Sequence, residues 1–186
     1  MKKEIRLLGF DDSAFNKFKD KKVKVIGCFF RGGSFLDGVL SFDVEVDGED
    51  STQKIIKAVE KSKFKSQVQA ILLDGIAVGG FNIIDIEKVF RKTNIPVIVV
   101  IRRMPNFTKI KTTLTQLNMA EKIKLIEKAG NVHKISRIYV QFCGIDLNDV
   151  KQILNLSCTH SYLPEPIRVA HLIGAGLYFG ESKGKA

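Results

Sequence analysis

Acidic residues follow several of the apolar runs that the sequence predicts to be β-strands. Carboxylates gathered at strand ends need a positive partner, and a divalent metal ion is the usual one. The chain nevertheless carries a formal net charge of +10. A basic protein around an acidic, metal-binding centre points to chemistry on a polyanion, above all nucleic acid. The acidic positions are Asp11-Asp12, Asp47, Asp50, Asp74 and Asp146.

The elements that must position these residues alternate in a recognisable order. Three strands are predicted first, and helices and strands then alternate to the end of the chain. This order predicts a ribonuclease-H-like α/β domain, a mixed sheet with helices on both faces. The expected strands are 5–10, 23–30, 35–46, 68–73, 95–101 and 137–142, and the expected helices are 50–62, 83–92, 106–117, 119–129, 147–156 and 164–179.

In this topology the first and fourth strands are neighbours and run parallel, so Asp11 and Asp74 are expected at the same edge of the sheet. We expect both to bind Mg²⁺, with Mn²⁺ as an alternative, and Asp47 or Asp50 to complete the coordination. No His and Cys residues occur at zinc-binding spacing. The alternative for each acid is a turn residue that caps or bends the chain. That alternative is less favoured for the pair of Asp11 and Asp74 than for Asp12, Asp47 and Asp50.

Basic residues extend from the same predicted edge of the sheet. Residues 102–128 hold seven basic and two acidic side chains, which is a typical phosphate-binding composition but equally a lysine-rich solvated surface. Arginine binds phosphate through two hydrogen bonds, and glycine amides can approach a phosphate or a flipped base. The nucleic-acid-binding residues expected on these grounds are Arg31, Gly79, Gly80, Arg102, Arg103, Lys109 and Lys111, with Lys122 and Lys124 extending the surface.

Length and composition favour a single cytoplasmic domain over 1–180 with a short basic tail over 181–186. The N-terminal residues do not resemble a secretory signal, and no apolar run reaches membrane-spanning length. The three cysteines are widely spaced, which is typical of reduced thiols.

Four sequence blocks together resemble the endonuclease dU family, a largely archaeal family related to endonuclease V. The blocks are Leu8-Gly-Phe-Asp-Asp-Ser-Ala-Phe15, Arg31-Gly-Gly-Ser-Phe-Leu-Asp-Gly-Val39, Leu73-Asp-Gly-Ile-Ala-Val-Gly-Gly-Phe-Asn82 and Pro164-Glu-Pro-Ile-Arg-Val-Ala-His171. The resemblance implies a ribonuclease-H-like fold. It also implies a metal-dependent endonuclease for DNA that contains deaminated bases, with deoxyuridine as the named target.

A comparison with endonuclease V implies a role for individual residues. Asp11 falls on that family's first metal aspartate, Asp74 lies in its Asp-Gly block, and Asp47 or Asp50 supplies the carboxylate after the third strand. Arg102 takes the place of a phosphate-binding lysine. Where endonuclease V has a late glycine-histidine pair, this chain has Gly144-Ile145-Asp146, and Asp146 either replaces the histidine as a ligand or caps the following helix. Endonuclease V separates DNA strands with an aromatic-proline block, and Phe35-Leu-Asp-Gly38 stands in the corresponding place.

The function expected from the sequence is therefore that of an Mg²⁺-dependent endodeoxyribonuclease in DNA repair. Asp11, Asp74 and Asp47 would be its catalytic carboxylates, and Arg102 would steady the phosphate. The DNA partner would contain uracil or another deaminated base. The alternatives are a catalytically inactive nucleic-acid-binding relative of endonuclease V and an enzyme that acts on a small phosphorylated metabolite. His171 is expected to be a packed or partly exposed helix residue rather than a ligand.

Overall fold

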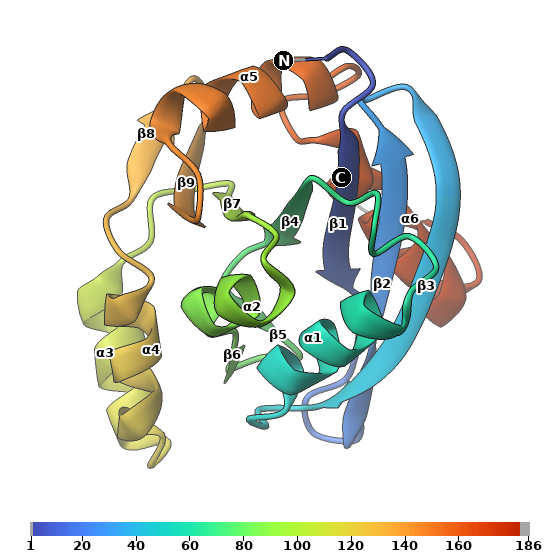
Figure 1. The fold of residues 1–186 in the computed structure, drawn as a ribbon. Coiled ribbons are helices and arrows are strands. Elements are labelled where there is room, and N and C mark those ends of the chain that lie inside the picture. Colours follow the sequence, from blue (N-terminus) through green and yellow to red (C-terminus); the bar gives the residue numbers. More distant parts are fainter. Residues whose placement is uncertain (1, 183–186) are drawn as a thin grey trace.

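Seven strands form one mixed sheet in the order β3-β2-β1-β4-β7-β9-β8 in the computed structural model, which describes residues 2–182 (Figure 1). The strands β1, β4 and β7 run parallel to one another, and β2, β3, β8 and β9 join by antiparallel pairing. A separate two-stranded ribbon is formed by β5 and β6. The bounds are β1 Arg6–Asp12, β2 Lys22–Arg31, β3 Phe35–Glu45, β4 Ala70–Asp74, β5 Ala77–Val78, β6 Asn82–Ile83, β7 Val97–Ile101, β8 His133–Ile135 and β9 Ile138–Cys143.

Helices cover both faces of this sheet, which confirms the predicted ribonuclease-H-like architecture. Figure 1 shows α1 and α2 in front of the sheet and α6 behind it. The helices are α1 Ser51–Lys61, α2 Ile86–Thr93, α3 Phe107–Gln116, the 3-10 helix η1 Ala120–Lys122, α4 Ile123–Lys128, α5 Leu147–Ser157 and α6 Glu165–Phe179. Within the described residues every helix is too short or too polar to span a bilayer.

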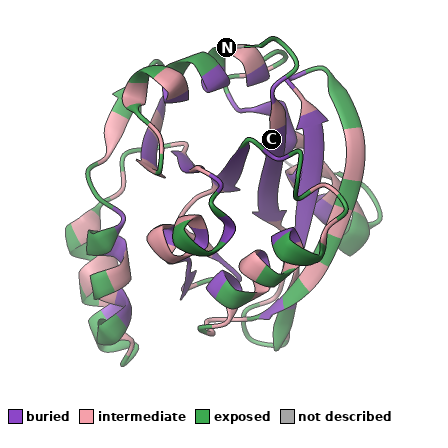
Figure 2. Cartoon of the chain, in the orientation of Figure 1, coloured by how far each residue is buried: buried purple, intermediate pink, exposed green. Residues whose placement is uncertain are grey.

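The sheet is buried on both faces because its central strands carry apolar residues at successive positions (Figure 2). Side chains alternate between faces along a strand. Leu8 and Phe10 of β1 therefore pack with Ile55 of α1 on one face, whereas Leu7 packs with Ile153 of α5 on the other. This alternation fixes the register of β1 and so places Asp11 on the same face of the sheet as Leu7.

Several elements differ from the sequence expectation. The helix expected from residue 83 begins at Ile86, because Asn82–Ile83 pairs with β5 and the Asp85 side chain accepts a hydrogen bond from the Lys88 amide as an N-cap. The strands β5, β6 and β8 were not expected, and the helix expected over 119–129 is divided into η1 and α4. Of the tail predicted over 181–186, residues 183–186 lie outside the described residues.

The helix α6 packs directly on β1, and Gly9 makes this close approach possible. A Cβ atom added at Gly9 would lie 2.5 Å from the Pro166 backbone and 2.8 Å from the Ile167 nitrogen, far inside van der Waals contact. Since α6 also carries His171, the absence of a side chain at Gly9 sets how deeply this histidine reaches toward the end of β1.

Gly9→Ala is expected to destabilise the protein by about 1–3 kcal/mol, because backbone rather than a flexible side chain must move aside. Gly176→Ala on the same helix is the matched control. Its added Cβ meets no atom within 4 Å, so the substitution should be neutral or stabilise by up to about 1 kcal/mol through helix propensity. Urea unfolding of both variants measures the difference. Equal free energies of unfolding would contradict the close approach of α6.

Candidate metal centre and its pocket

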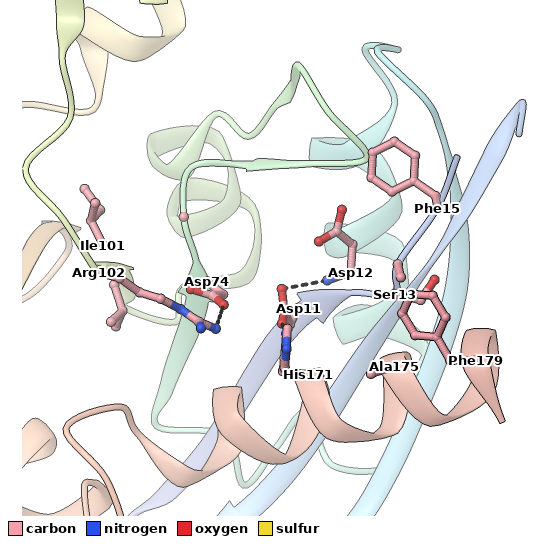
Figure 3. Close-up of a pocket in the computed structure, with 13 residues that line it drawn as sticks. Asp11, Asp12, Ser13, Phe15, Asp74, Ile101, Arg102, His171, Ala175 and Phe179 are labelled. Carbon is pink, nitrogen blue, oxygen red and sulfur yellow. Dashed lines mark hydrogen bonds and ion pairs between the residues drawn. The ribbon is translucent and has the colours of Figure 1, made fainter. Parts of the chain in front are cut away.

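Asp11, Asp74 and His171 converge at the carboxyl ends of the two parallel strands β1 and β4 (Figure 3). One ligand atom from each residue lies within 4.8 Å of the others. Phe10 pairs with Leu73 across the two strands, so the next residues, Asp11 and Asp74, lie side by side near the ends of β1 and β4. The structure therefore places these two carboxylates at the same edge of the sheet, as the parallel pairing of the two strands predicted.

The Asp11 carboxylate is buried and lies near two other carboxylates. Asp11 is 4% exposed, and its burial raises the pKa of the carboxyl group to about 7, with a further contribution from Asp74 and Asp12. His171 Nδ1 lies 2.8 Å from Asp11 Oδ2, and this hydrogen bond raises the pKa of the imidazole. The pair therefore retains protons into the neutral range unless another positive group replaces them.

For His171 the sequence favoured a packed or partly exposed helix residue over a ligand, and its partly exposed imidazole lies beside Asp11. The imidazole comes from α6, not from the segment after β9 where the resemblance to endonuclease V placed the late histidine. One signal was present in the sequence, since His171 follows Ile167 by four residues and precedes Gly174 by three. Ile167 and Gly174 are both buried, so His171 belongs to the helix stripe that faces the sheet.

Arg102 follows β7 and is paired with Asp74. Its Nη2 donates to Asp74 Oδ2 at 2.6 Å, and both groups are partly buried. These residues line an open pocket of about 540 Å³ together with Asp11, His171 and the loop after β1. Phe15 and Phe179 stand at the edge of this pocket in Figure 3. The pocket thus combines carboxylates, an arginine and aromatic rings.

The loop between β4 and α2 is held by two aspartates that the sequence analysis weighed as metal ligands. Gly79 donates its amide to Asp12 Oδ2 at 2.6 Å, and burial raises the pKa of Asp12. The Asp47 carboxylate accepts a hydrogen bond from the Phe81 amide at 2.7 Å and leaves no room for a side chain at Gly80. The amide of Gly79, which was expected to approach a phosphate or base, is therefore already bound to Asp12.

Asp50 and Asp146 also lie outside the group formed by Asp11, Asp74 and His171. Asp50 Oδ1 accepts hydrogen bonds from the Glu45 amide and from the Asn82 side chain, which ties the end of β3 to β6. Asp146 is the N-cap of α5, and its carboxylate accepts a hydrogen bond from the Asp149 amide at 2.9 Å. The cap was one of the two readings of Asp146 that the sequence left open.

The expected nucleic-acid-binding residues are spread over different regions of the molecule. Arg31 pairs with Arg6 at the start of β1, about 17 Å along the strand from Asp11, and donates two hydrogen bonds to Asp37. Lys122 is 4% exposed, and its Nζ donates to the carbonyls of Asp47, Gly48 and Phe81, so it stabilises loops instead of facing solvent. Three others lie on or near α3: Arg103 and Lys109 are exposed, and Lys111 forms an ion pair with Glu127 at 2.6 Å.

Phe35–Gly38, which the resemblance aligned with the strand-separating block, also lies away from the pocket. Phe35 pairs with Arg31 at the far end of the sheet from Asp11. About half the length of β2, from Arg31 to Ile26, separates Phe35 from Asp11, so this block does not line the pocket.

Comparison with other proteins agrees with this architecture. A protein from Archaeoglobus fulgidus has a solved structure with a TM-score of 0.86 and 38% sequence identity over 92% of this chain and 97% of its own. The endonuclease V of Ciona intestinalis, crystallised with DNA that contains inosine, has a TM-score of 0.58 and 16% identity over 89% of this chain and 82% of its own, which shows the shared fold.

Sequence relatives identify the family. A UPF0215 protein of Methanosarcina barkeri is 46% identical over 100% of this chain and 97% of its own length. The family model for endonuclease dU matches residues 3–178. The chain therefore belongs to the endonuclease dU family, and its fold is the ribonuclease-H-like fold of endonuclease V.

Proposed function

We propose that this protein is a divalent-metal-dependent endonuclease that cuts DNA at deaminated bases, with deoxyuridine as the first substrate to test. The observation that supports the proposal is the convergence of Asp11, Asp74 and His171 in an open pocket next to Arg102. The family name and the endonuclease V fold support a nuclease. The DNA bound to the Ciona enzyme supports a nucleic-acid substrate.

The residues of this pocket fit a hard divalent cation. Two carboxylates and one imidazole supply ligand atoms within 4.8 Å of one another, and Asp11 is a buried carboxylate that lies close to a second one. A cation would relieve this repulsion and displace the proton that the Asp11–His171 pair retains. Carboxylate oxygens suit Mg²⁺ and Mn²⁺, and the imidazole adds a donor that Mn²⁺ accepts more readily than Mg²⁺. When bound, such an ion activates a water molecule and stabilises the charge that develops on the phosphate.

The remaining residues of the pocket have complementary tasks. A guanidinium carries five N–H donors in a fixed plane, so Arg102 can hold Asp74 in position and donate to a phosphate oxygen as well. The hydrogen bond from Nδ1 to Asp11 orients the His171 ring. Asp12 supports the pocket from behind, because its hydrogen bond to the Gly79 amide fixes the loop that follows Asp74.

The presence of His171 bears on the alternative that the chain is an inactive relative of endonuclease V. That alternative rested on the loss of the late histidine from the segment after β9. Because the imidazole of His171 on α6 lies beside Asp11, the missing late histidine no longer argues for a loss of activity. The convergence of Asp11, Asp74 and His171 supports the nuclease proposal.

Cutting of labelled duplexes with one uracil or one hypoxanthine tests the proposal. With Mg²⁺ or Mn²⁺, wild-type protein should cut near the altered base, and EDTA should abolish the cutting. Asp74→Asn should lower the rate by about a hundredfold or more, the scale of losing one group that stabilises a transition state. Asp37→Asn, an acid at the far end of the sheet, is the control and should cut normally. Tight, salt-sensitive binding of DNA without cutting would contradict the proposed nuclease activity. It would support the alternative of a catalytically inactive nucleic-acid-binding protein.

The placement of Asp47 yields a second prediction. Asn keeps an oxygen that can accept the hydrogen bond from Phe81 and tolerates the positive φ of 55° at this position, so Asp47→Asn should retain both the fold and the cutting rate. Asp11→Asn should lose roughly a hundredfold in rate. A large loss of cutting in Asp47→Asn with an unchanged melting temperature would show that Asp47 is a ligand after all.

Metal binding should depend on pH in a defined direction. The pKa of Asp11 is raised to about 7 by burial and that of His171 is raised by its hydrogen bond to Asp11, so the pair takes up protons as the pH falls through neutrality, and a cation must displace them. The rise in melting temperature that Mn²⁺ produces should therefore be larger at about pH 8 than at about pH 6. Asp11→Asn removes a proposed ligand and should abolish most of the Mn²⁺-induced shift at both pH values. A metal-induced shift that is the same at both pH values would contradict the assignment.

A further inference from the structure

The loop of residues 13–21 between β1 and β2 leaves the pocket and presents an aromatic ring to solvent. Ser13, Ala14 and Phe15 line the pocket, whereas Phe18 is 86% exposed, the highest exposure among the large apolar residues of the described chain. Three residues span at most about 11 Å, so the Cα atom of Phe18 lies within that distance of the Cα atom of Phe15. A single exposed phenyl ring is common on protein surfaces, so its role has to be argued from the other residues of the loop.

This ring is displayed by an ordered turn. The Asn16 side chain accepts a hydrogen bond from the Phe18 amide at 3.0 Å, and Asp20 accepts one from the Asn16 amide at 2.7 Å. The Lys19 and Asp20 amides both donate to the Asn16 carbonyl. The Asp20 carboxylate also accepts a hydrogen bond from the Tyr178 hydroxyl at 3.5 Å, which links the turn to α6. Little conformational entropy would be lost if the ring met a ligand here.

Positive charge follows the ring along the chain. Lys17, Lys19 and Lys21 of the loop and Lys22 at the start of β2 are all exposed, and Lys17 Nζ lies 4.8 Å from the centroid of Phe18. The loop therefore combines a flat apolar surface with cations spaced along a short segment. Proteins bind the bases and the phosphates of unpaired nucleic acid strands with this combination.

We propose that Phe18 stacks on an unpaired nucleobase of the bound strand while the lysines of the loop contact the neighbouring phosphates. The inference rests on the proposed function, because it supplies the site at Asp11 with a means of holding a base out of the duplex. Phe15 of the same loop and Phe179 of α6 line the pocket itself. The proposed stacking residue and the pocket are therefore joined by one short loop.

A second copy of the chain is the other partner that an exposed aromatic could serve. A symmetric dimer places the same surface of each copy against the other. Lys17, Lys19, Lys21 and Lys22 of both copies would then lie in one interface, and like charges in an interface are costly. A polyanion has the complementary charge, so the loop favours nucleic acid over self-association.

The central experiment compares Phe18→Ala with Phe35→Ala, a control that removes another exposed ring at the far end of the sheet. Binding of a fluorescein-labelled single-stranded DNA is measured by anisotropy in EDTA, so that cutting plays no part. Phe18→Ala should weaken binding by roughly tenfold or more, the range found when one stacking aromatic is removed. Phe35→Ala should bind as the wild type does.

A direct readout of stacking is available because the chain contains no tryptophan. Phe18→Trp introduces a single indole that retains the ability to stack, so its affinity should match the wild type. Its fluorescence should be quenched when single-stranded DNA is added and should change far less with a fully paired duplex. Phe35→Trp should show no quenching with either DNA.

Three results would overturn the inference, and they are distinguishable from failure of the nuclease. Wild-type affinity in Phe18→Ala, with cutting intact, would refute stacking and leave the proposed function standing. Loss of a dimer in Phe18→Ala, seen by sedimentation with unchanged DNA affinity, would assign the ring to self-association. Absence of any DNA binding by the wild type at low salt would remove both the inference and the function on which it rests.

Discussion

Two carboxylates at the ends of adjacent parallel strands impose the constraint on which the rest of this structure depends. Parallel pairing of β1 with β4 makes Asp11 and Asp74 neighbours, and burial of Asp11 prevents water from screening their repulsion. The fold places positive groups on both sides in response. His171 hydrogen bonds to Asp11, and Arg102 forms an ion pair with Asp74. A divalent cation would also reduce the repulsion between the two carboxylates, and this reduction would favour its binding.

The surrounding backbone is shaped to keep these contacts. The helix α6 can bring His171 to the end of β1 only because Gly9 lets the Pro166 backbone approach closely. The loop after Asp74 is held between Asp12 and Asp47, and buried Lys122 joins the 47–48 turn to Phe81. Asp12, Asp47 and Lys122, which lie outside the group of Asp11, Asp74 and His171, therefore bind backbone atoms. These contacts stabilise the loops around the pocket.

The distribution of the other charges separates one side of the molecule from the rest. Arg31, bound to Asp37 at the far end of the sheet, is distant from the pocket, whereas the loop that carries Lys17, Lys19 and Lys21 begins with residues that line it. Arg102, after β7, lines the same pocket. If the proposed stacking is correct, a bound strand would contact both this loop and the pocket.

The sequence by itself determined the alternation of the main strands and helices, the parallel pairing that brings Asp11 and Asp74 to one edge of the sheet, and the family, because these depend on local hydrophobic periodicity and on contiguous blocks of residues. Only the tertiary structure decided the partners of each charged side chain. Asp47, Asp50 and Asp146 precede turns or helices just as a ligand would, and their hydrogen bonds to backbone amides become visible only in the folded chain. His171 meets Asp11 across 160 residues of sequence, and Phe35 is carried away from the pocket by the direction of β2. Contacts of this kind depend on how the helices pack against the sheet, and a local sequence pattern does not specify the distance between residues that are far apart in the chain.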